Sequence, residues 1–334
     1  MGELRRDPIT GRWVIVGTDN NGFKLEDYYS EPNIKGKGVC PFCPGNEKMT
    51  PPEIIAHREG GGAPNSPGWL TRVVSNKFPA LQIEGDLNKR GIGIYDMTNG
   101  VGAHEVIIDN PDHNKEMADL YDHDVERIIW TYRNRSVDLR GDRRFKYILI
   151  FKNYGKPAGA SLEHPHSQLI ALPIVPKRVR EELQGAQKYY EYKERCVFCD
   201  IISQEIQDGS RIIAENKHFV ALTPFVSCFP FEFWVMPKAH ESDFSYIQRE
   251  EVLNFASILR ESLLRAKVVL RDPSFNFIIH TSPIEDMESE DYHWHLEFMP
   301  KLTRLAGFEW GSGFYINPVD PNIAAKYLRE AKIT

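Results

Sequence analysis

The sequence has no long hydrophobic run, no excess of basic charge and few cysteines. The longest apolar runs, such as residues 147–151, are far shorter than the ~20 residues that a membrane span needs. No apolar stretch follows the basic pair at positions 5 and 6, so a secretory signal is not expected. The net charge of −6 argues against nucleic-acid binding through bulk charge. Hydrophobic residues at 41% and charged residues at 26% are typical of a soluble globular protein and exclude a disordered chain, a collagen and a coiled coil.

The chain has 334 residues, which is long enough for about two domains. An odd number of cysteines, five, argues against a disulfide framework. Together with the missing signal, this predicts a cytoplasmic protein. Four of the five cysteines form two Cys-x-Phe-Cys pairs, which lie nearly half the chain apart, and the fifth is expected to be a buried thiol. The pairs are Cys40 with Cys43 and Cys196 with Cys199, and the fifth cysteine is Cys228.

The spacing of the cysteine pairs suggests an internal duplication, and the segments that follow them agree. Residues 72–81 resemble residues 211–222. Each half then has an apolar stretch ending in a lone histidine, a helical pattern (116–139 and 248–268), a β-rich run (145–151 and 276–280) and a His-x-His segment predicted to be a strand. A charged helix over 178–195 leads into the second half.

The repeated order predicts an α+β fold made of two tandem halves. Each half is expected to be a mostly antiparallel sheet with packed helices, because helices and strands do not alternate strictly. We place the N-terminal half at residues 1–177 and the C-terminal half at residues 178–334. The glycine-rich residues 59–68 read as a surface loop rather than a phosphate loop, since no strand and helix flank them in the required order.

Each half carries the ligands of a tetrahedral zinc site. The alternatives are redox-active cysteine pairs and buried thiols near unrelated histidines. The similar spacing of the histidines in both halves favours two closed, structural sites. His104 competes with His113 as a ligand, and iron is an alternative to zinc at the second site. The predicted sets are Cys40, Cys43, His113 and His164, and Cys196, Cys199, His240 and His293.

The segment around His164 and His166 also contains the candidate nucleophile. Residues two apart on a strand share a face, so His166 and Gln168 should lie beside the metal ligand His164. A neutral imidazole is a good nucleophile toward phosphorus near pH 7. The preceding turn, from Asn153 through Gly159 and Ala160 to Ser161, can offer N–H and hydroxyl donors to a phosphate. Because Pro165 cannot donate to a ladder, this strand is expected to be an edge strand or to face an opening. The alternative for the segment is a histidine-rich strand that serves only the metal.

These residues resemble the active-site signature of the galactose-1-phosphate uridylyltransferase family, a branch of the histidine-triad superfamily with two triad-like halves. The signature covers residues 153–168. Further motifs that resemble the family are Glu3-Leu-Arg-Arg-Asp-Pro-Ile-Thr-Gly-Arg-Trp-Val, Cys40-Pro-Phe-Cys43-Pro-Gly-Asn-Glu, Trp234-Val-Met-Pro-Lys-Ala-His240 and Gly307-Phe308-Glu309.

The resemblance implies an enzyme of galactose metabolism that moves a uridylyl group in two steps. His166 would attack the α-phosphorus of UDP-glucose, release glucose 1-phosphate, and then pass UMP to galactose 1-phosphate. The resemblance also implies a homodimer whose sites borrow residues from the partner subunit. It assigns phosphate contacts to Asn153, Ser161 and Gln168, the nucleoside to Asn76 and Phe78, and hexose hydroxyls to Phe308 and Glu309.

Three departures from the family pattern keep alternatives open. No arginine follows the Trp13-Val segment, Glu297 replaces a histidine in the second half, and residues 311–319 resemble a plant ADP-glucose phosphorylase. An adenylyl transferase or ADP-glucose phosphorylase is therefore the main alternative. A nucleotide hydrolase of the triad type is another. A third is a zinc-stabilised nucleotide-binding protein without activity.

Overall fold

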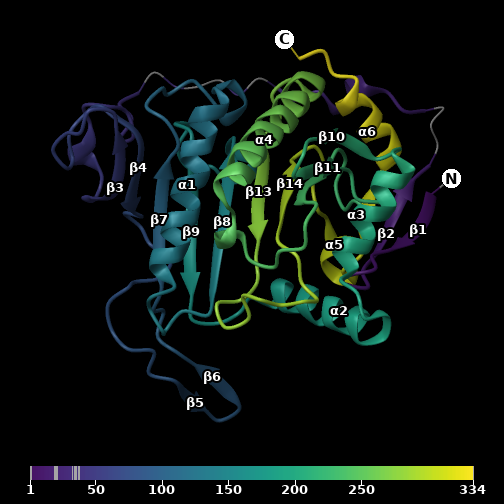
Figure 1. The fold of residues 1–334 in the computed structure, drawn as a ribbon, viewed down its shortest axis with the longest axis horizontal. Coiled ribbons are helices and arrows are strands. Elements are labelled where there is room, and N and C mark those ends of the chain that lie inside the picture. Colours follow the sequence, from purple (N-terminus) through teal and green to yellow (C-terminus); the bar gives the residue numbers. More distant parts are fainter. Residues whose placement is uncertain (1, 19–21, 32, 34–35, 37, 334) are drawn as a thin grey trace.

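A single ten-stranded antiparallel sheet organises the computed structural model, which describes residues 2–18, 22–31, 33, 36 and 38–333 (Figure 1). Across the sheet, the strands of the second half come first and those of the first half follow. The second half contributes β10 (Ile212–Glu215), β11 (Phe219–Leu222), β12 (Phe233–Pro237), β14 (His295–Pro300) and β13 (Phe275–His280). The first half contributes β8 (Tyr147–Tyr154), β9 (His166–Leu172), β7 (Ala103–Ile108), β4 (Trp69–Ser75) and β3 (Glu53–Arg58).

The two halves join where β8 pairs with β13. The pairing is antiparallel, and its register places Asn276 opposite Asn153 and Ile279 opposite Ile150. The two expected sheets are therefore one continuous sheet. The α+β class and the antiparallel pairing are confirmed, and the boundary between residues 177 and 178 stays a prediction.

Two long helices, α1 (Asp122–Leu139) and α4 (Arg249–Leu270), lie side by side across one face of the sheet (Figure 1). Alternate residues of the central strands, such as Leu169, Phe277 and Leu296, are buried against these helices. Because successive strand residues point to opposite faces, their neighbours His166, Asn276 and His295 share the other face. This second face carries the functional residues of both halves.

The remaining elements surround this framework. The N-terminal strands β1 (Gly2–Arg6) and β2 (Trp13–Gly17) form a separate sheet with β15 (Tyr315–Asn317), so the start of the chain packs on the second half. The hairpin of β5 (Arg90–Ile92) and β6 (Tyr95–Met97) projects away from the body (Figure 1). The other helices are α2 (Lys177–Lys193), α3 (Val197–Asp208), α5 (Gly307–Ser312) and α6 (Pro321–Arg329). Among the described helices, none has the length and apolar character needed to cross a bilayer.

Most of the predicted elements are confirmed. The patterns over 248–268, 145–151, 276–280 and 178–195 correspond to α4, β8, β13 and α2, and the glycine-rich residues 59–68 form the loop between β3 and β4. The pattern over 116–139 is divided, because α1 begins only at Asp122 and a 3-10 turn, Met117–Asp119, precedes it.

Two predictions about the His-x-His segments were wrong. His164 and His293 do not lie within strands, since β9 begins at His166 and β14 at His295. The edge-strand interpretation of Pro165 is wrong as well, because β9 lies between β8 and β7 in the interior of the sheet. The other interpretation, that the segment faces an opening, agrees with the cavity that Pro165 lines. Pro165 comes just before the first ladder residue, so its missing N–H costs no sheet hydrogen bond, and its carbonyl accepts the N–H of Asp109 at 3.1 Å.

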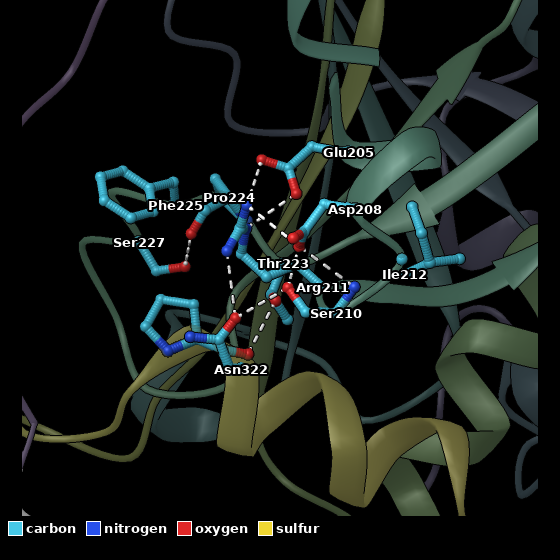
Figure 2. A network of polar contacts seen from close by, with 12 residues as sticks. Glu205, Asp208, Ser210, Arg211, Ile212, Thr223, Pro224, Phe225, Ser227 and Asn322 are labelled. Atoms are coloured by element: carbon cyan, nitrogen blue, oxygen red, sulfur yellow. Dashed lines mark hydrogen bonds and ion pairs between the residues drawn. The ribbon is translucent and has the colours of Figure 1, made fainter. Parts of the chain in front are cut away.

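A buried ion-pair network ties α3, β10 and α6 together at the outer corner of the second half (Figure 2). Arg211 donates to both carboxylate oxygens of Glu205 at 2.7 and 3.0 Å, and to Asn322 Oδ1 at 3.0 Å. The first half has a comparable network, in which Arg72 donates to Glu53 at 3.2 Å. Each half therefore has its own buried charge pair.

Candidate active site and metal centres

The four ligands predicted for the first metal site come together in the structure. One ligand atom from each of them lies within 4.8 Å of the others. Cys43 Sγ lies 3.4 Å from His113 Nδ1 and 3.5 Å from His164 Nδ1. Two thiolates and two imidazoles at this spacing suit a tetrahedral zinc ion. The set is Cys40, Cys43, His113 and His164.

A backbone hydrogen bond selects the ligand nitrogen of His164. The Nε2–H group donates to the carbonyl of Asn110 at 2.9 Å, which leaves Nδ1 free of a proton and facing the cysteines. Burial lowers the pKa of His164 to about 4, so the ring is neutral. Such outer contacts orient metal-binding histidines.

The second predicted set assembles in the same way. Cys199 Sγ lies 3.4 Å from His240 Nδ1 and 3.6 Å from His293 Nδ1. Both histidines donate from Nε2 to carbonyls, His240 to Ser289 at 3.1 Å and His293 to Pro237 at 2.9 Å. Cys196 completes the group. Both four-residue sets can thus hold a metal ion, and His104, the alternative to His113, belongs to neither set.

His166 is held with its outer ring nitrogen available for reaction. Its Nδ1 lies 2.8 Å from the carbonyl oxygen of His164, which can only accept a proton. The proton of the neutral ring is therefore on Nδ1, and Nε2 carries the lone pair. Burial, with a smaller contribution from the Lys152 charge, lowers the pKa of His166 and keeps the ring neutral. A neutral, oriented imidazole is what nucleophilic catalysis requires.

A cavity of about 530 Å³ opens beside His166. Asn153, Ala160 and Ser161 line it, as the sequence predicted for a phosphate site. The N–H groups of Gly159 and Ala160 close the turn itself by donating to Lys156 and Gly155 at 3.0 and 3.2 Å. The donors that this loop offers to a phosphate are therefore the Asn153 amide and the Ser161 hydroxyl.

A buried lysine that the sequence did not reveal lies behind His166. Lys152 Nζ is 2.8 Å from Asp109 and 3.2 Å from Glu116, and it lies 3.4 Å from the carbonyl oxygen of His166. Burial alone would lower the pKa of Lys152, but the two carboxylates outweigh this and raise it. The resulting ammonium fixes the first residue of β9 from below.

Gln168 is oriented by His104. The N–H of Ala80 donates to His104 Nδ1 at 3.1 Å, so the proton of the neutral ring is on Nε2 and is donated to Gln168 Oε1 at 2.8 Å. The amide nitrogen of Gln168 then remains a donor for a ligand. Asn76, predicted to hold the nucleoside, lies 3.0 Å from the same His104 nitrogen. The structure thus connects Asn76 to Gln168 through a residue that the sequence offered only as a metal ligand.

The structure does not bring every predicted residue to the cavity. Phe78 is 84% exposed on the loop after β4. Phe308 and Glu309 lie on α5 in the second half, and neither lines the cavity beside His166. The Glu309 carboxylate accepts the N–H of Ala306 at 3.0 Å, which caps the helix. Within this single chain the hexose contacts expected of α5 are not formed.

The second half has a counterpart of His166 in different surroundings. His295 Nδ1 lies 3.1 Å from the carbonyl of His293, as in the first half, but its ring stacks on His280 with centroids 4.7 Å apart. His280 is 3.1 Å from Glu182 and 3.2 Å from Glu297. Burial lowers the pKa of His280, but these carboxylates outweigh burial and raise it to about 10.

The sequence analysis missed this second-half cluster. Ligand-type atoms of Glu182, His280 and His295 lie within 4.8 Å of one another. Glu182 and Glu297 support a positive charge on His280, and Arg12, Arg178 and Lys301 line the same cavity of about 540 Å³. Of the residues in and around this cluster, the sequence analysis names only Glu297, as a departure from the family pattern. The spacing of Glu182 and His280 in the chain carries no signal, because α2 and β13 meet only in the folded protein.

Comparisons with known proteins agree with this geometry. The family model "Galactose-1-phosphate uridyl transferase, N-terminal domain" matches residues 3–176, and a domain of unknown function, DUF4921, matches residues 102–331. The chain is 36% identical to an ADP-glucose phosphorylase of Arabidopsis thaliana over 99% of this chain and 93% of that protein. It is 31% identical to a galactose-1-phosphate uridylyltransferase of Thermotoga maritima over 100% and 99% of the two chains.

A solved structure extends the likeness to three dimensions. The crystal structure of an Arabidopsis thaliana ADP-glucose phosphorylase with bound ADP-glucose superposes with a TM-score of 0.84 at 33% identity, and each chain is covered completely. These relatives are enzymes of the nucleotidyltransferase type, and this chain is one as well. The chain belongs to the galactose-1-phosphate uridyl transferase family.

Proposed function

We propose that this chain transfers a nucleotidyl group from a nucleotide sugar through a covalent nucleotidyl-His166 intermediate. One observation carries the proposal. The Nδ1–H of His166 is bonded to the His164 carbonyl, so Nε2 is the nucleophilic atom on a ring that lines the cavity. Asn153 and Ser161 line the same cavity, and Gln168 follows on the same face of β9. These three side chains are suited to hold phosphate oxygens.

The reaction consists of two displacements at the α-phosphorus. In the first, His166 Nε2 bonds to phosphorus while the bond to the bridging oxygen breaks, and glucose 1-phosphate leaves with that electron pair. In the second, a phosphate oxygen of the acceptor bonds to phosphorus and the phosphorus–nitrogen bond breaks, returning the electron pair to Nε2. Orthophosphate as acceptor gives a nucleoside diphosphate, and a hexose 1-phosphate gives a new nucleotide sugar.

We propose ADP-glucose as the preferred donor. Residues 311–319 resemble a plant ADP-glucose phosphorylase, and a structural relative that is covered completely contains ADP-glucose. The missing arginine after Trp13 favours an acceptor other than a hexose phosphate, and orthophosphate is the simplest one. UDP-glucose with galactose 1-phosphate is the second candidate, supported by the Thermotoga maritima relative, which is matched over nearly its full length.

Zinc is the metal we assign to both four-residue sets, with iron as the alternative at the second. The donor chemistry supports this, since two thiolates and two imidazoles complete a tetrahedron and leave no position for a substrate. The metal would supply rigidity, because the carbonyl of the ligand His164 accepts the His166 proton. We also propose a cytoplasmic homodimer in which Phe308 and Glu309 serve the site of the partner subunit.

The decisive experiment is adduct trapping with two donors. The protein is incubated with ADP-glucose or UDP-glucose labelled at the α-phosphorus, denatured in alkali to preserve a phosphoramidate, and counted. We expect label from ADP-glucose to exceed label from UDP-glucose, and His166→Gln to remove it. Higher labelling from UDP-glucose would reverse the donor assignment, and no labelling from either would refute the covalent mechanism.

A further inference from the structure

The phosphate loop of the first half rests on a strand of the second half. Asn276 of β13 lies directly opposite Asn153 of β8 in the sheet register. Its amide nitrogen donates to Asn153 Oδ1 at 2.7 Å and to the carbonyl of Ala158 at 2.8 Å. Asn276 does not line the cavity beside His166. It lines a second cavity of about 540 Å³, to which Asn153 also contributes, so its link to the His166 cavity runs through Asn153.

The contacts define the orientation of both amides. The carbonyl oxygen of Ala158 can only accept, so the nitrogen of Asn276 must face it. That same nitrogen faces Asn153, whose nearer atom must therefore be its oxygen. The Asn153 nitrogen is left directed to the loop, where a Cβ placed on Gly159 would lie 4.0 Å from it. Asn276 thereby determines that Asn153 presents a donor, and not an acceptor, to an anion.

Neighbouring residues of the second half support the same loop. Gly155 begins the turn at a φ of 80°, and a Cβ there would lie 2.0 Å from Ser274 Oγ, so the backbone packs directly on the residue that precedes β13. Tyr154 donates to Asp272 at 2.7 Å. Asp272, Ser274 and Asn276 therefore form a continuous support under the turn from Gly155 to Ser161.

We infer that Asn276 is a positioning residue for nucleotidyl transfer, acting across the junction of the halves by orienting Asn153 and the 155–160 turn. The inference rests on the proposed function, since it takes Asn153 to contact the phosphate. A misdirected Asn153 would present its oxygen to the phosphate, which repels it. Loss of one such donor slows adduct formation by roughly tenfold to a hundredfold.

A double-mutant cycle tests the inference. Asn276→Ala, Asn153→Ala and the double variant are compared by the rate constant of adduct formation at saturating donor. The donor is whichever of ADP-glucose and UDP-glucose labels the wild type. The matched control is Asn216→Ala, because the Asn216 amide likewise donates to a backbone carbonyl, that of Asn254 at 2.8 Å, away from the cavity. Metal content and thermal unfolding verify the fold of each variant.

We expect Asn276→Ala to slow the wild type and to have little further effect once Asn153 is absent, while Asn216→Ala changes neither background. Fully multiplicative losses would overturn the inference, because they would show that Asn276 does not act through Asn153. If Asn276→Ala does not fold, Asn276→Asp keeps the side-chain shape and replaces the donor with an acceptor. It should slow adduct formation at least as much as Asn153→Ala, and a wild-type rate would overturn the inference.

The experiment separates this inference from the proposed function. A wild type that forms an adduct, together with multiplicative losses, overturns only the role of Asn276. If the wild type forms no adduct, the proposed mechanism fails. The wild type, the two single variants and the double variant are then compared by their dissociation constants for ADP. A non-multiplicative weakening of ADP binding then supports Asn276 as a phosphate-positioning residue, and multiplicative weakening or no binding overturns it.

Discussion

The two halves of this chain share a framework of two cysteines and two histidines that could hold a metal ion, but they differ in what surrounds the second histidine of each His-x-His segment. His166 and His295 both direct Nδ1 to the carbonyl of the metal-ligand histidine two residues earlier. His166 then faces a cavity with neutral donors. His295 is stacked on His280 and lies within 5.1 Å of the Trp234 ring centroid.

The difference teaches that the metal framework is not sufficient for a nucleotidyl site. Two residues after the second histidine, the first half carries the neutral amide of Gln168 and the second half carries the carboxylate of Glu297. A carboxylate repels a phosphate, and here it pairs with His280 at 3.2 Å instead. We interpret the second half as a scaffold whose strand β13 supports the phosphate loop of the first.

Exchanging the imidazole of each half should have the largest effect. His166→Gln should reduce adduct formation by on the order of 10⁴-fold or more, since no other nucleophile is positioned. The equivalent change, His295→Gln, should leave adduct formation unaltered, because His295 does not line the cavity beside His166. Labelled-donor trapping measures both. A folded His295 variant that forms no adduct would contradict the proposed difference between the two halves.

Removing the buried arginine of each half should affect stability. Arg211→Ala leaves Glu205 buried and unpaired, which should cost about 3–5 kcal/mol (Figure 2). Arg72→Ala should cost less, because Arg58 still pairs with Glu53 at 2.8 Å. Thermal unfolding with hydrogen exchange should place the loss in the mutated half. Arg211→Ala should leave adduct formation at 25 °C unchanged. A slower rate of adduct formation in this variant would show that the stability of the second half affects the chemistry of the first.

Removing one metal ligand from each half should separate rigidity from catalysis. Cys43→Ala and Cys199→Ala should each lower the metal content by one ion per chain, as expected for closed four-ligand sites. Only Cys43→Ala should slow adduct formation, by roughly tenfold to a hundredfold, because the carbonyl of His164 orients His166. Equal slowing by both variants would contradict this assignment, and metal analysis of the purified variants is the accompanying control.

Removing His104 should have the smallest effect. His104→Ala deletes the hydrogen bond to Gln168 Oε1 and frees the amide to rotate. A single hydrogen bond contributes about 1 kcal/mol, so adduct formation should slow about fivefold. His123→Ala, at an exposed histidine on α1, serves as the control. If the His104 variant matched the control in single-turnover kinetics, Gln168 would not need orientation.

The residues that the sequence predicted correctly are those with short, repeated spacing. The cysteine pairs, the lone histidines His113 and His240, and helix α4 could be read because their patterns recur in both halves. The roles of Lys152, His104 and Asn276 could not be read. Each acts through a partner on another strand, and a sequence by itself does not specify which strands become neighbours.

By itself the sequence determined the duplicated plan, the two four-residue metal sets and the segment that carries His166. These features depend on covalent spacing, which places residues two or three apart on common faces or turns. The tertiary structure alone decided that the two sheets fuse at β8 and β13, that Asn276 orients Asn153, and that carboxylates surround His295. Those features depend on cross-strand register, which forms only when both halves bury their apolar faces beneath α1 and α4.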